Sequence, residues 1–114
     1  MRLTVSTNPV PPGRYLAELT GIRHTNRGTY GPGLRFEFTI CGGPLQGRKI
    51  SRMTGCIPGP TNALGSLLRD LLGRPLQIGE EIDVDPLINR EYSIEVALSE
   101  SGASYVETAK SCSP

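Results

Sequence analysis

One stretch of eight residues, 34–41, constrains the fold of this chain more than any other. It reads LRFEFTIC, with apolar side chains at positions 34, 36, 38 and 40 and polar ones at 35, 37 and 39. A period of two fits a β-strand with one buried face and does not fit a helix. Because Phe36 and Phe38 are the only phenylalanines of the chain, we expect this strand at the centre of the core. Its other face, with Arg35 and Glu37, then points to solvent or to a ligand.

Four further segments predict β-strands. Gly21 interrupts the first of these segments, residues 14–22, and is a candidate β-bulge. Glycine-rich or polar stretches separate the segments, as expected for short strands joined by turns. The four segments are residues 14–22, 48–54, 91–98 and 105–110.

One segment, residues 61–73, predicts an α-helix. Its leucines recur at 64, 67, 68, 71 and 72, which places them on one stripe of a helix. Thr61 and Gly73 are the predicted caps, with Pro75 as a stop just beyond. Between this helix and residue 91 we expect a short extended piece near 81–84 and one helical turn after Asp85-Pro86.

The predicted order is therefore three strands, one helix and a closing hairpin. This is the order of the OB-fold (oligonucleotide/oligosaccharide-binding fold), a mainly β, five-stranded Greek-key barrel with its α-helix between strands 3 and 4. A β-sandwich is the second interpretation and would need more strands. The 114 residues allow one domain. We expect it at 13–110, after an extended Pro-rich arm at 1–12 and before a frayed tail at 111–114.

Charge is distributed unevenly, although the net charge is only +1. Residues 1–52 hold eight basic and two acidic residues, whereas residues 53–114 hold four basic and nine acidic ones. Such an asymmetry predicts a basic binding face, and its alternative is ordinary solvated surface.

Catalytic and metal-binding patterns are weak in this sequence. The single histidine, His24, stands in a polar stretch, and no Gly-x-Ser-x-Gly motif is present. The three cysteines, Cys41, Cys56 and Cys112, lack the spacing of a zinc site. We interpret them as reduced thiols of a cytoplasmic protein, the alternative being a disulfide between two of them. We expect no enzymatic activity, no metal and no cofactor, and neither a membrane span nor a signal peptide.

Four motifs carry a resemblance to a known group of proteins. They are GRYLAEL at 13–19, YGPGLRFEF at 30–38, GPLQGR at 43–48 and LLGRPLQIGE at 71–80. In this order they resemble a set of small bacterial and phage or prophage proteins, most of them uncharacterised. That set is often regarded as single-stranded-DNA-binding proteins of the OB-fold. The resemblance covers about residues 13–110 and implies the same fold, with single-stranded DNA as the partner.

The OB-fold places its ligand across strands 2 and 3 and between two loops, which correspond here to 34–41, 48–54, 23–33 and 99–104. Guanidinium groups in these elements can pair with phosphates, and an aromatic ring can stack on a base. The predicted nucleic-acid-binding residues are Arg23, Arg27, Tyr30, Arg35, Arg48, Lys49 and Arg52. Since the chain has no Trp and only Tyr30 is clearly placed to stack, we expect modest, salt-sensitive and sequence-tolerant binding.

The alternative function is a protein-interaction or self-assembly module without a nucleic-acid ligand. The acidic second half and the leucine-rich helix could bind a replication or recombination protein, and edge strands could pair with a second copy. An oligosaccharide site ranks last because the chain has no Trp platform.

Overall fold

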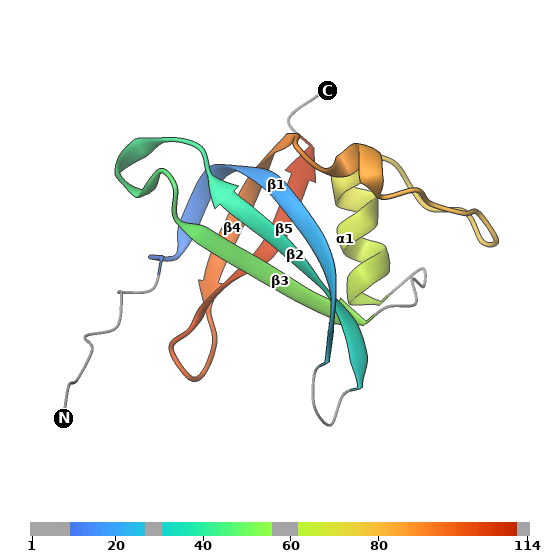
Figure 1. Ribbon diagram of the computed structural model, residues 1–114, viewed down its shortest axis with the longest axis horizontal. Helices are drawn as coiled ribbons and strands as arrows, with labels where there is room; N and C mark the ends of the chain where they lie inside the picture. The colour runs from blue at the N-terminus through green and yellow to red at the C-terminus, as the bar shows by residue number, and fades with distance from the viewer. Residues whose placement is uncertain (1–9, 27–30, 56–61, 112–114) are drawn as a thin grey trace.

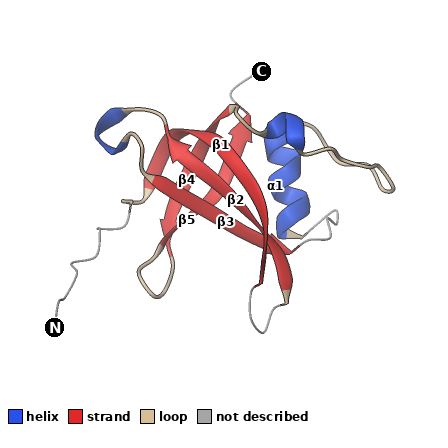
Figure 2. Ribbon diagram, in the orientation of Figure 1, coloured by secondary structure: helices blue, strands red, loops and turns tan. Residues whose placement is uncertain are grey.

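The computed structural model describes residues 10–26, 31–55 and 62–111, and it is mainly β. Five strands form one antiparallel sheet in the order β3-β2-β1-β4-β5, with one α-helix beside it (Figures 1 and 2). Two 3₁₀ turns, at Gly43–Leu45 and Asp85–Leu87, lie in the connections. The strands are β1 (Gly13–Asn26), β2 (Pro32–Ile40), β3 (Lys49–Gly55), β4 (Glu91–Leu98) and β5 (Ser104–Ser111), and the helix is α1 (Ala63–Leu72).

Strand β1 is the longest element and joins the two halves of the sheet. Its first part, from Gly13 to Glu18, pairs with β4, and its later part, from Ala17 to Asn26, pairs with β2. The β1–β2 register shifts between Leu19 and Gly21, so Thr20 is the extra residue of a β-bulge. Such bulges bend a strand and increase its twist, which fits the strong curl of the sheet in Figure 1.

The core lies between the concave side of the sheet and α1. Phe36, Phe38 and Ile40 of β2 are all buried. The Phe38 and Tyr92 rings are edge-on, with their centroids 6.5 Å apart. The leucine stripe of α1 faces the sheet, where the helix contacts β5 and β3. This confirms the alternation read in residues 34–40 and the helical stripe.

The edges of the sheet, β3 and β5, approach each other. Arg52 of β3 lies with its guanidinium carbon 5.8 Å from the centre of the Tyr105 ring on β5. Just before β1, Val10 is 1% exposed and donates its backbone N–H to Ser104 Oγ at the start of β5. The described end of the expected N-terminal arm is thus packed into the core.

Three details differ from the sequence-based expectations. The loop expected at 23–33 is shorter, because residues 23–26 pair with 32–35 as strand. Asn62, and not Thr61, caps α1: its side chain accepts the backbone N–H of Gly65 at 2.8 Å, and Thr61 lies outside the described residues. The piece near 81–84 is not a strand, whereas the turn at Asp85–Leu87 is present.

Candidate nucleic-acid interface

A shallow hollow of about 450 Å³ lies on the convex face of β1, β2 and β3, the side of the sheet away from the core. Three of its residues are basic and one is acidic. The strand register explains the grouping, since Arg23 pairs with Arg35 and Thr39 pairs with Lys49. The hollow is lined by Thr20, Arg23, Arg35, Glu37, Phe38, Thr39, Lys49, Ile50 and Ser51.

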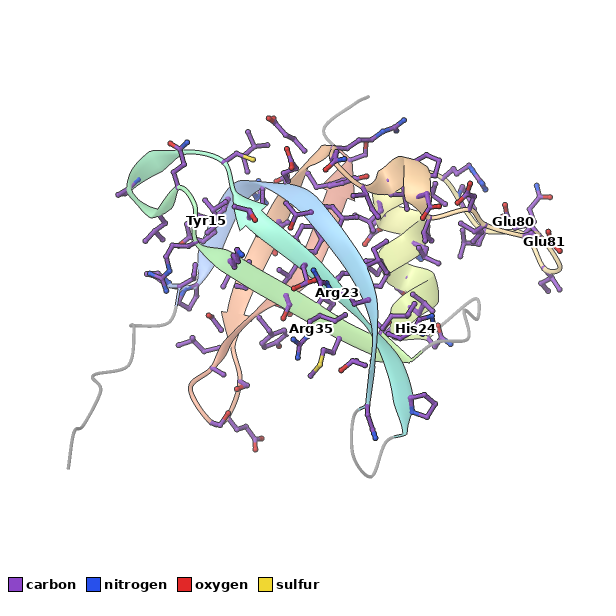
Figure 3. The ribbon with its side chains drawn as sticks, viewed as in Figure 1. Tyr15, Arg23, His24, Arg35, Glu80 and Glu81 are labelled. Atoms are coloured by element: carbon purple, nitrogen blue, oxygen red, sulfur yellow. The ribbon has the colours of Figure 1, made fainter. Side chains whose placement is uncertain are left out.

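Arg23 and Arg35 are direct cross-strand partners (Figure 3). Like charges placed opposite each other destabilise a sheet. Glu37 relieves part of this repulsion through an ion pair with Arg23. The Arg23 side chain nevertheless stays 76% exposed, so its charge remains available to solvent.

Arg35 and Lys49 extend the positive charge toward the edge strand. Arg35 Nη2 lies 3.9 Å from the sulfur of Met53, its partner on β3, and Met53 is 49% exposed. Lys49 is exposed, and no ion pair is found for it within the described residues. With Glu37 as the single carboxylate of the lining, the hollow is electropositive.

The structure does not bring all the predicted residues together. Arg35 and Lys49 share the face of the hollow with Arg23, but strand alternation turns Arg52 to the side of Ile50, which is buried. Arg48 precedes β3 and does not line the hollow. Arg52 then reaches the Tyr105 ring, as described above. Arg27 and Tyr30 lie outside the described residues, so their placement in the site stays a prediction.

Two residues near the site were missed by the sequence reasoning. Met53 lies beside Arg35 because the two are cross-strand partners in β2 and β3. Tyr105 lies beside Arg52 because β3 and β5 meet, a contact between distant parts of the chain. The alternation of residues 49–54 could have revealed Met53, since it shares the parity of Lys49. Nothing in the sequence pairs Tyr105 with Arg52.

A second hollow of about 400 Å³ lies where the end of α1 meets the end of β5. Its arginines are neutralised: Arg69 pairs with Asp70 at 3.5 Å, and Arg74 pairs with Glu80 at 3.0 Å. The hydrogen bond from Arg74 lowers the pKa of Glu80, and the bond from the Gln77 backbone N–H lowers it further. Lys110 also lines this hollow, and no ion pair is found for it among the described residues. With one uncompensated cation, against Arg35 and Lys49 in the first hollow, the second hollow is the weaker anion site.

Other chemistry is sparse in the described part of the chain. Residues 10–26, 31–55 and 62–111 contain no group of three or more His, Cys, Asp or Glu side chains arranged to hold a metal. In the same residues no helix is both long and apolar enough to cross a membrane. Cys41 is half-buried and its thiol donates to the Thr39 carbonyl at 3.6 Å, and the other two cysteines lie outside the described residues.

Comparisons with protein-family models, with curated proteins and with solved structures give no match to this chain.

Proposed function

We propose that this chain binds single-stranded nucleic acid, with DNA as the first candidate, on the convex face of β1, β2 and β3. The binding is non-enzymatic and tolerates many sequences. The observation that carries the proposal is the opposed pair of Arg23 and Arg35, with Lys49 beside them and only Glu37 to compensate. A polyanion laid over this face would turn the repulsion between the cations into attraction for its phosphates.

The proposed fold is a closed OB-fold-like barrel, and the strand order supports it. In the order β3-β2-β1-β4-β5, closure brings the two edge strands together, and β3 and β5 are in contact. The bend in β1 and the helix between β3 and β4 agree with the same topology. On this fold the ligand crosses strands 2 and 3, where the hollow lies.

The direct test is a titration of a fluorescently labelled, roughly 20-nucleotide single strand against the full chain at several salt concentrations. Three phosphate contacts, at about −0.7 each, predict a slope of log affinity against log salt of about −2. Lys49→Gln should remove about one contact and weaken binding about fivefold near 0.1 M salt.

Lys110→Gln is the matched control, because Lys110 is an exposed lysine of β5 that lines the second hollow and not the first. It should leave the affinity unchanged. The absence of binding at about 50 mM salt, or equal losses in the two variants, would refute the proposal.

A protein-interaction function is the second candidate, and one observation favours it. Ile78 is 95% exposed at the tip of a turn that Gln77 and Glu80 close, and the exposed Glu81 and Asp83 follow it. Such an apolar tip beside carboxylates suits a basic, apolar pocket on a partner. If the chain ignores single-stranded DNA and Ile78→Ser abolishes a complex seen by sedimentation, this candidate replaces the first.

A further inference from the structure

We infer that Tyr105 is a base-stacking platform, so the site contacts the bases of its ligand as well as the phosphates. This inference rests on the proposed function and adds to it a ligand chemistry that the hollow lacks. The hollow's polar lining and three cations can hold phosphates, but the described residues that line it include no exposed aromatic ring. A ligand contacted there alone would be held by its backbone.

Tyr105 lies on the solvent side of its strand pair. It pairs with Ala97 of β4, whereas the next pair, Val96 with Val106, is buried. The Tyr105 side chain is half-buried, and Leu98, which follows its partner, is 45% exposed. The Tyr105 ring is therefore partly accessible on the solvent side of β5, while alternation turns Leu98 to the face of Val96.

Strand β3 connects this ring to the hollow. The guanidinium of Arg52 lies over the Tyr105 ring, while Lys49 and Ser51 of the same strand line the hollow. Because Arg52 points to the other face of β3 from these two residues, a ligand that crosses the hollow reaches Tyr105 by continuing past the β3 edge of the sheet to β5. Phosphates over the hollow and a base on the ring would then belong to one strand.

The cation–π contact between Arg52 and Tyr105 also prepares the ring to stack on a base. A guanidinium over one side of an aromatic ring fixes the orientation of the ring. A base can then stack on a ring that is already ordered, which lowers the entropy lost on binding. Stacking of one base on an aromatic side chain changes affinity by roughly 5- to 150-fold.

The test compares two labelled probes of equal length and equal phosphate number, a thymidine 15-mer and its abasic analogue. The wild-type chain should bind the thymidine strand at least about fivefold more tightly than the abasic strand. Tyr105→Leu should reduce the affinity for thymidine to the abasic level and leave abasic binding and the salt slope unchanged. Tyr105→Phe, which keeps the ring, should behave as the wild type.

Tyr15→Leu is the control for loss of a half-buried tyrosine elsewhere. Tyr15 lies near the start of β1, where its hydroxyl donates to the Pro11 carbonyl, and it does not line the hollow (Figure 3). Its loss should leave the ratio between the two probes as it is. Equal affinities of the wild-type chain for the two probes would overturn the inference without any variant. The inference therefore stays refutable even if the Tyr105→Leu chain does not fold.

Equal wild-type affinity for the two probes would overturn the inference and leave phosphate binding in place. Equal weakening of both probes by Tyr105→Leu would also overturn it, because the ring would then act only through the fold. If neither probe binds at about 50 mM salt, the proposed function fails together with the inference.

Discussion

Replacement of Glu37 by Gln should strengthen the binding of single-stranded DNA. Glu37 is the only carboxylate that lines the hollow, and it forms an ion pair with Arg23. Gln keeps the shape of the side chain but not its charge, and the Thr20 hydroxyl bonds to the backbone carbonyl of residue 37, so that bond survives. The change therefore releases one guanidinium with little effect on the strand.

The magnitude follows from the exposure of the pair. The Arg23 and Glu37 side chains are 76% and 34% exposed, and exposed ion pairs contribute about 0.2–1 kcal/mol. A ligand no longer has to displace this pair, which corresponds to an affinity gain of about 1.5- to 5-fold. Because Arg23 is already one of the three counted phosphate contacts, the salt slope should stay at about −2.

Fluorescence anisotropy of a labelled thymidine 15-mer, repeated between about 20 and 200 mM salt, measures both quantities. Glu107→Gln is the matched control, because it removes an exposed carboxylate from β5, outside the lining of the hollow. The control should gain much less. Equal gains in the two variants would mean that only net charge matters, and a loss of affinity in Glu37→Gln would refute the role assigned to the hollow.

Three further predictions concern stability and local order. Phe38→Ala should lower the free energy of unfolding by about 3–5 kcal/mol in chemical denaturation, because Phe38 is fully buried. Asn62→Ala should cost about 1 kcal/mol in the same assay, since it removes the cap on α1. The pKa of Glu80 is lowered in the folded state, so its bond to Arg74 stabilises the fold at pH values above the unfolded pKa. This stabilisation is lost as the pH falls through the folded pKa. NMR should show the Gln77 amide losing its protection from hydrogen exchange, relative to the intrinsic exchange rate at each pH, as the pH falls through the folded pKa of Glu80, and Glu80→Gln should remove that pH dependence.

Most of the fold could be predicted because burial alternates cleanly in β2, β3 and β4 and follows a stripe in the helix. The strand conformation at the end of β1, residues 23–26, was not predicted, because the bulge at Thr20 changes the phase of the alternation. Ala17 and Leu19 face the core before the bulge, and Ile22 does so after it. A constant period of two therefore fails across this point, and residues 23–26 look like a loop. Their strand conformation comes from pairing with β2, which is a tertiary effect.

The candidate site was only partly predictable, because cations were counted by segment and not by face. Arg48 and Lys49 are chain neighbours, yet Lys49 lines the hollow and Arg48, which precedes β3, does not. If the face decides binding, Lys49→Gln should reduce the salt slope by about 0.7, and Arg48→Gln should leave it unchanged. Salt-dependent anisotropy of the two variants measures this difference, with thermal melting to compare their stability. Equal salt slopes in the two variants would mean that the ligand does not distinguish a residue of the hollow from its neighbour outside it. That result would refute the hollow as the binding site.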